Sequence, residues 1–194
     1  IRDRSPSRGL GDVYKRQQKG QIMSKRALIV TGKLVQDHEY IYPYYRLQEE
    51  GYEVDVAVRG KQMVLGSIGV KVEPTKDIPE LRVEDYELLV LPGGAKAMEY
   101  MRQDKDIIKF IADFYAAGKV IAAICHASQL LISAKVVKGK KVSGYYSMEY
   151  YIENAGSTYV DAPYVNDERL VTSPHYKHVG PWMRETFAQV EKTR

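Results

Sequence analysis

The chain contains very little cysteine: one residue, Cys125, among 194. A single cysteine cannot form an internal disulfide, which fits a reducing compartment, and we expect a cytoplasmic protein. No apolar run approaches the ~20 residues needed to span a bilayer, so no membrane partner is expected. The formal charge is only +4, and the sequence has no dense Lys/Arg block with interleaved aromatic residues, which argues against a nucleic-acid partner.

The start of the chain differs from the rest in composition. Residues 1–17, IRDRSPSRGLGDVYKRQ, are charged and rich in Ser and Gly, and they lack the apolar centre of a secretory signal. They also resemble translated sequencing-adapter text. We therefore interpret residues 1–22 as an artefactual or disordered extension, expect the natural protein to begin at Met23, and assign residues 23–194 to a single domain.

From residue 26 onward, strand and helix patterns alternate. Short apolar runs such as ALIVT and KVIAAI are typical of buried parallel strands, and segments with apolar residues at helical spacing are typical of amphipathic helices. The predicted strands are 27–31, 54–58, 87–91, 119–124, 141–143 and 169–172, and the predicted helices are 37–50, 107–117, 126–134 and one from about Pro181. Residues 60–84 are expected to form a small excursion from the sheet. The sequence therefore predicts an α/β fold, with a mostly parallel sheet and helices on both faces.

Unusual residues follow three of the predicted strands. They are Gln36–Glu39 after the first strand, Pro92–Gly94 after ELLVL, and Cys125–His126 after KVIAAI. In open parallel sheets, ligand sites lie beyond the carboxyl ends of the strands. These segments are therefore the candidate site.

The segment AAICHASQLL (residues 122–131) places Cys125 between an apolar strand and a helix. Such an elbow holds its nucleophile in a strained turn, and small residues such as Ala123 and Ala127 leave room for it. A helix N-terminus also favours the thiolate form, which predicts a lowered pKa. Alternatively, Cys125 is a buried and inert cysteine. The residues alone leave both interpretations open.

Glu39 and the glycine pair also have two interpretations each. Glu39 is either a solvated residue of a surface helix or a carboxyl group that points toward Cys125 and orients its proton. Gly93 and Gly94 form either a simple tight turn or a backbone site whose N–H groups hold an oxyanion.

Several segments resemble the PfpI-like branch of the ThiJ/PfpI superfamily. AAICHASQLL is similar to the AICHGPQLL elbow of that branch, and QDHEYIYPYYRLQEEGYEVDVA (residues 36–57) is similar to its first helix and second strand. YELLVLPGG, VKGKKVSGY, NAGSTYVDAPYVNDERLVTS and WMRETF also fit, so the resemblance covers roughly residues 25 to 190. It implies a flavodoxin-like three-layer sandwich with a nucleophile elbow, related to the class I glutamine amidotransferases.

The resemblance also implies roles for individual residues. Cys125 matches the family's nucleophile, and Glu39 matches the glutamate that contacts it. His126 matches a histidine that pairs with a glutamate from a neighbouring subunit, for which Glu99 is the matching position. The spacing after the glycine pair is one residue longer here than in the family. Tyr145 matches the tyrosine that closes the pocket.

The chain departs from the family pattern at the rim of the expected pocket. Ala127 and Ser128 replace the family's Gly-Pro, and Gln36 stands where many members carry a second acidic residue. PHYKH (residues 174–178) replaces the usual Arg, which alters the rim and the substrate. His175 and His178 lack the glutamate of an amidotransferase His-x-Glu and a nearby third metal ligand. We therefore expect a rim or solvated role for both histidines, and no metal or other cofactor.

Two classes of function fit these features. In the first, the protein is a cysteine-dependent hydrolase or glyoxalase/deglycase acting on small carbonyl compounds, their adducts or peptides. Cys125 would then attack a carbonyl group, and the N–H groups of Gly94 and Ala127 would hold the oxyanion. In the second, it is a non-catalytic stress-response chaperone or a redox sensor that uses Cys125 oxidation. Both classes need an accessible, reactive cysteine, so the sequence leaves them open.

A homo-oligomer is expected because the resemblance places Glu99 at a subunit boundary. The segment AMEYM (residues 97–101) surrounds Glu99 with Met98, Tyr100 and Met101, types that are enriched in interface cores. Alternatively, these side chains pack within their own chain and Glu99 is solvated.

Overall fold

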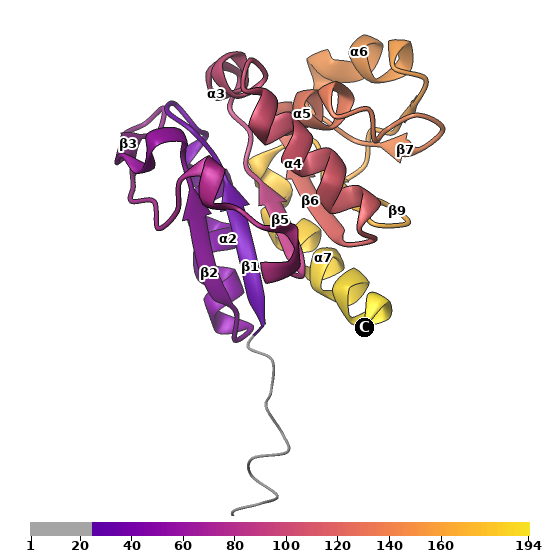
Figure 1. Ribbon diagram of the computed structural model, residues 1–194. Coiled ribbons are helices and arrows are strands. Elements are labelled where there is room, and N and C mark those ends of the chain that lie inside the picture. The colour runs from indigo at the N-terminus through magenta and orange to yellow at the C-terminus, as the bar shows by residue number, and fades with distance from the viewer. Residues whose placement is uncertain (1–24) are drawn as a thin grey trace, which may run out of the picture.

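A mostly parallel sheet forms the centre of the structure, a computed structural model that describes residues 25–194 (Figure 1). The expected extension at residues 1–22 and the expected start at Met23 lie outside the described residues. The strands lie in the order β2, β1, β5, β6, β10, β9, and only β9 runs antiparallel to its neighbour. Their bounds are β1 Arg26–Val30, β2 Glu53–Ala57, β5 Leu88–Leu91, β6 Val120–Ile124, β9 Val165–Asp167 and β10 Leu170–Ser173.

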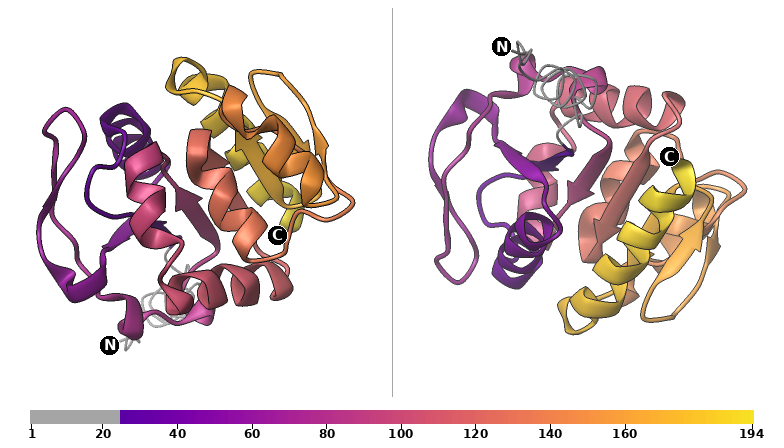
Figure 2. Two further views of the ribbon diagram at one scale, coloured as in Figure 1. Left: turned by 90° about the horizontal axis from the view of Figure 1, so that it is seen from above. Right: turned by 90° about the horizontal axis from the view of Figure 1, so that it is seen from below.

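Helices cover both faces of this sheet (Figure 2). Helices α2 (Asp37–Glu49) and α7 (Val179–Thr193) pack on one face, and α4 (Lys105–Ala116) and α5 (Ser128–Ser133) pack on the other, with the short α3 (Ala95–Met101) above the carboxyl edge. This arrangement confirms the predicted three-layer, flavodoxin-like α/β sandwich.

Side-chain alternation along the central strands explains why both faces are covered. Successive residues of a strand point to opposite sides of the sheet. In β1, Ala27 and Ile29 pack in the same cluster as Trp182 of α7, whereas Leu28 and Val30 pack in the cluster of Phe114 of α4. All six side chains are at most 1% exposed. A strand that is apolar on both faces is stable only between two helical layers.

Smaller elements lie at the periphery. The excursion at residues 60–84 contains the antiparallel pair β3 (Val64–Leu65) and β4 (Lys71–Val72). The parallel pair β7 (Lys141–Val142) and β8 (Thr158–Tyr159) flanks α6 (Glu149–Asn154).

Three details of the sequence interpretation are corrected. The helix expected from His126 is instead a 3₁₀ turn, η4 (Cys125–Ala127), followed by α5. The last helix begins at Val179 rather than near Pro181. Elements α3, α6, β8 and β9 were not predicted, because each is too short to show a clear hydrophobic period.

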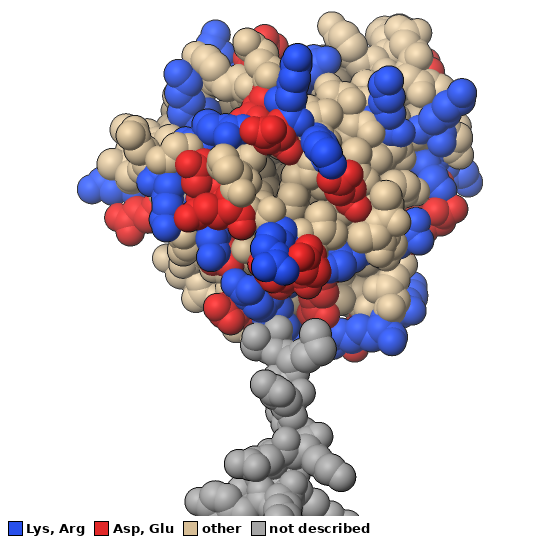
Figure 3. Space-filling model, viewed as in Figure 1, with Lys and Arg blue, Asp and Glu red and all other residues tan. Residues whose placement is uncertain are grey.

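Acidic and basic side chains are interspersed over the face seen in Figure 3, which fits the small net charge of +4. Within residues 25–194, no helix is long and apolar enough to cross a membrane.

Candidate active site

A pocket lies beyond the carboxyl ends of three adjacent strands, β1, β5 and β6. Because these strands are parallel neighbours, the loops that follow them meet at one edge of the sheet. The cavity has a volume of about 390 Å³. It is lined by Leu34, Gln36, Glu39, Ser67, Gly94, Ala95, Lys96, Cys125, His126, Tyr145, His175 and Tyr176.

Cys125 sits at the turn between β6 and η4 with a left-handed backbone, φ +61°. This conformation costs a residue with a Cβ roughly 1–2 kcal/mol, so it is retained only where the surrounding structure enforces it. The thiol is 6% exposed and lines the pocket. The backbone N–H groups of His126 and Gly94 are directed at the sulfur. The nucleophile-elbow geometry inferred from the sequence is therefore present at this position.

Gly93 lets Glu39 approach the cysteine. Its backbone N–H donates to Glu39 Oε2 at 2.8 Å. A Cβ at this position would lie 2.6 Å from the same oxygen, 2.6 Å from the carbonyl oxygen of Ile124 and 2.9 Å from Cys125 Cβ. Glycine is therefore required here, because the backbone at position 93 passes between Glu39 and Cys125 with no room for a Cβ.

Glu39 and Cys125 face each other across this glycine, and each affects the pKa of the other. Glu39 is 0% exposed, and its Oε1 makes no hydrogen bond of ordinary geometry with the part of the chain that the structure describes. The contact is therefore best described as electrostatic proximity between carboxyl and thiol rather than as a formed hydrogen bond.

Burial raises the pKa of both groups. Desolvation raises the pKa of Glu39 to about 7, although the Gly93 N–H and the Cys125 side chain act to lower it. Burial and the charge of Glu39 raise the pKa of the Cys125 thiol. The expectation of a lowered thiol pKa is therefore wrong. The α-helix proper begins only at Ser128 and has 6 residues, so the dipole at the sulfur is weak compared with desolvation.

His126 and Tyr145 form one wall of the pocket. His126 Nδ1 lies 3.2 Å from Cys125 Sγ, and burial lowers the pKa of the imidazole. The ring of His126 stacks on Tyr145 with a centroid distance of 4.5 Å. Tyr145 N–H also donates to the carbonyl oxygen of Cys125 at 3.1 Å, which ties this wall to the elbow.

The rim of the pocket is aromatic. His175 packs against Tyr176 with tilted rings, 4.1 Å between centroids, and His38 stacks on Tyr176 at 4.8 Å. His175 also approaches Tyr145 at 6.1 Å. The structure thus places His175 at the rim, whereas His178 does not line the cavity.

Two other expected site residues lie outside the pocket. Ala127 is fully buried behind the elbow and does not line the cavity, so the second N–H near the sulfur comes from His126. Glu99 is exposed on α3 and does not contact His126 of its own chain. Met98 and Met101 are 0% and 3% exposed. The expectation that both surround Glu99 at a subunit contact is therefore wrong, because the inner face of α3 packs on the core.

Sequence reasoning missed Ser67, which reaches the pocket from the excursion after β3. Asp37, at the first turn of α2, positions this loop by accepting hydrogen bonds from Ser67 Oγ, Ile68 N and Val70 N at 3.0, 2.8 and 2.6 Å. The only signal in the sequence was that Asp37 lies within the candidate segment Gln36–Glu39. Gln36 caps α2, because its Oε1 accepts from His38 N at 2.7 Å. Among residues 25–194, no group of three or more His, Cys, Asp or Glu side chains is arranged to hold a metal ion.

Comparison with known proteins agrees with the fold. The model of the DJ-1/PfpI family matches residues 25–189. The chain belongs to the DJ-1/PfpI family.

Relatives carry names that indicate enzymatic activity in the family. The chain is 36% identical to a Pyrococcus furiosus protein named Deglycase PfpI over 160 residues, which cover 82% of this chain and 96% of that protein. It is 34% identical to the Escherichia coli protein named Protein/nucleic acid deglycase 2 over 154 residues, covering 78% and 89%. The crystal structure of Drosophila melanogaster DJ-1beta superposes with a TM-score of 0.78 at 26% identity, covering 88% of this chain and 95% of that one. These names support a deglycase-like function for the family branch to which the chain is similar.

Proposed function

We propose that this protein is a cysteine-dependent deglycase that removes small α-oxoaldehydes from amines and related nucleophiles, with Cys125 as the nucleophile. The observation that carries the proposal is the pairing of a buried thiol and a buried carboxyl group on the floor of a pocket, in a chain that is similar to proteins named deglycase. A pair of this kind, held within a strained elbow, is typical of an activated nucleophile and its proton acceptor.

The first chemical step uses groups that are already in place. Sulfur adds to the carbonyl carbon of the adduct, the thiol proton moves to the Glu39 carboxylate, and the carbonyl π electrons become an oxyanion. The N–H groups of Gly94 and His126, which approach the sulfur, would bind that oxyanion. Over the complete reaction, the adduct and one water give the free amine and a hydroxy acid.

The properties of Glu39 suit a group that accepts the thiol proton. Its pKa of about 7 lies near neutral pH, where a group accepts and returns a proton with similar ease. Because the thiol pKa is raised, Cys125 holds its proton until substrate arrives, and deprotonation is coupled to the attack on carbon. Neutral His126, next to the sulfur, is available to donate to or accept from the substrate.

The aromatic rim supports a substrate larger than a free aldehyde. Tyr145, His175 and Tyr176 line the cavity with aromatic rings. Flat groups such as the guanidinium of a glycated arginine pack well against aromatic rings. We infer that the adduct's carrier group rests on this rim while the carbonyl carbon reaches Cys125.

Turnover of purified methylglyoxal adducts tests the proposal. Adducts of N-acetylarginine and N-acetylcysteine are incubated with the parent chain, Cys125→Ser and Glu39→Gln, and release of the free amino acid derivative is followed by chromatography. We expect no activity above background for Cys125→Ser and a loss of at least tenfold for Glu39→Gln. The exposed Glu153→Gln serves as the matched control and is expected to match the parent.

Parent-like turnover by Cys125→Ser would refute the proposal. Turnover of free methylglyoxal but of neither adduct would refute the deglycase assignment and leave a glyoxalase.

A further inference from the structure

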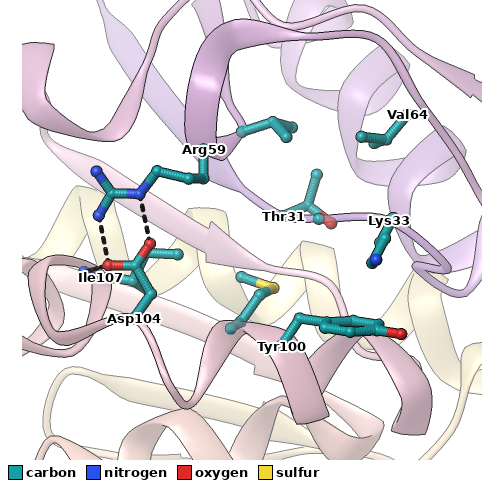
Figure 4. A pocket seen from close by; sticks show the side chains of 10 residues that line it. Thr31, Lys33, Arg59, Val64, Tyr100, Asp104 and Ile107 are labelled. Atoms are coloured by element: carbon teal, nitrogen blue, oxygen red, sulfur yellow. Dashed lines mark hydrogen bonds and ion pairs between the residues drawn. The ribbon is translucent and has the colours of Figure 1, made fainter.

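A second cavity, with a volume of about 250 Å³, lies beside the C-terminal end of α3 (Figure 4). It is bounded by the end of β1, the end of β2, the β3 strand and the C-terminal turn of α3. Its lining residues are Thr31, Gly32, Lys33, Val58, Arg59, Val64, Tyr100, Met101, Asp104 and Ile107. It shares none of them with the Cys125 pocket. It is therefore a separate site at the same edge of the sheet.

The walls of this cavity are largely apolar. Val58, Met101 and Ile107 are at most 4% exposed and form its inner surface, and Val64 and Tyr100 form its lip. Figure 4 shows Thr31 and Val64 across the cavity from the helix that carries Tyr100. Concave apolar surfaces with a few placed polar groups are typical of small-molecule sites.

A polar group without a partner lies inside this apolar surface. Thr31 is 1% exposed, and within residues 25–194 its hydroxyl makes no hydrogen bond. Its backbone N–H is already used, donating to the carbonyl oxygen of Ala57 at 3.1 Å. Leaving a buried hydroxyl unpaired is unfavourable, so a ligand that pairs with it gains affinity. In Figure 4 this hydroxyl lies on the side of the cavity nearest to Lys33.

The two cations at the cavity mouth differ in their availability. The Arg59 guanidinium is bound by both oxygens of Asp104, at 2.7 and 2.5 Å, and by Asp106 at 2.7 Å, so its charge is more than neutralised. The Lys33 ammonium instead lies 3.9 Å from the centre of the Tyr100 ring, and the described part of the chain offers it no carboxylate within 4.0 Å. Lys33 is therefore the cation available to a ligand, and it can balance one negative charge.

We propose that this cavity binds a small monocarboxylate with an apolar body. The carboxylate accepts hydrogen bonds from the Lys33 ammonium and the Thr31 hydroxyl, and the apolar body packs against Met101 and Ile107. A second negative charge is disfavoured, because Asp104 and Asp106 at the same mouth would repel it. The paired Arg59 closes one side and is not displaced.

Isothermal titration calorimetry of the full chain with 4-methylpentanoate tests this site. Its neutral isostere, 4-methylpentanamide, serves as the charge control. We expect saturable binding of the carboxylate with millimolar or tighter affinity, and at least about tenfold weaker binding of the amide. Lys33→Met is expected to weaken the carboxylate about tenfold and Thr31→Val several-fold, whereas Lys192→Met, an exposed lysine on α7, should leave it unchanged.

Two further controls locate the binding. Lys33 is exposed, so Lys33→Met should fold normally even if the buried Thr31→Val does not. Cys125→Ser should bind the carboxylate as the parent does, because the Cys125 pocket is separate. The proposal is overturned if no saturable binding occurs, if the amide binds equally well, if Lys33→Met binds like the parent, or if Cys125→Ser abolishes binding.

Discussion

Replacing Glu39 with glutamine should stabilise the protein, and the gain should depend on pH. Glu39 is fully buried, and burial raises its pKa from the ordinary 4.5 to about 7. An acid whose pKa is raised by folding contributes stability that is fully present below pH 4.5 and is lost as the pH rises through 7. Above that range, the folded state must hold a buried carboxylate that the unfolded chain would leave in water.

The size of this effect follows from the difference between the ordinary pKa of 4.5 and the raised pKa of about 7. Each tenfold change in proton affinity corresponds to about 1.4 kcal/mol, so the interval between 4.5 and about 7 corresponds to about 3 kcal/mol. Glutamine keeps the shape and can still accept the Gly93 N–H, but it does not titrate. The free energy of unfolding of Glu39→Gln, measured relative to the parent, should therefore rise by about 3 kcal/mol between pH 4.5 and pH 8.5.

Urea unfolding at a series of pH values provides the measurement. Trp182 is the only tryptophan of the sequence and is fully buried, so its fluorescence reports loss of the core. Protein concentration is held constant, because any association would change the apparent stability. Glu153→Gln, an exposed residue of α6, is the matched control and should follow the parent at every pH. Parallel curves for Glu39→Gln and the parent, or a relative loss of stability with rising pH, would refute the reasoning.

Two further predictions concern the elbow and assembly. Gly93→Ala should lower the free energy of unfolding by about 2 kcal/mol and abolish turnover, because the new Cβ would lie within 3 Å of Glu39 and Cys125. Gly180→Ala is the control and should not be destabilised, because its Cβ would meet nothing closer than Tyr42 Oη at 3.8 Å. We also expect an oligomer in which Glu99 of one chain approaches His126 of the next. Light scattering after size exclusion should give the mass of at least a dimer, and Glu99→Ala should lose activity. A monomer whose Glu99→Ala variant stays active would contradict both expectations.

The sheet and the floor of the site could be predicted from the sequence because strong local signals specify them. β1, β5 and β6 are continuous apolar runs, and the rule that parallel strands end at one edge brings Glu39, Gly94 and Cys125 together. Helix α4 was also recognisable, since its apolar residues keep a helical period.

The rim and the pKa of the thiol could not be predicted in this way. Ser67 enters the pocket only because Asp37 holds its loop, a tertiary contact between segments with no shared pattern. The stacking of His38 on Tyr176 joins the first turn of α2 to the short 3₁₀ helix after β10, two segments that are far apart in the sequence. The sign of the Cys125 shift depends on how deeply the thiol is buried and on the charge of Glu39, and neither quantity is visible in a motif.

The left-handed backbone of Cys125 has a consequence for directed evolution. At φ +61°, glycine is the residue that the backbone accepts without strain. A selection that rewarded only thermal stability would therefore favour glycine at position 125 and an uncharged residue at position 39, and it would remove the proposed nucleophile and its proton acceptor together. Libraries built on this chain should hold both positions fixed, or screen for chemistry before they screen for heat resistance.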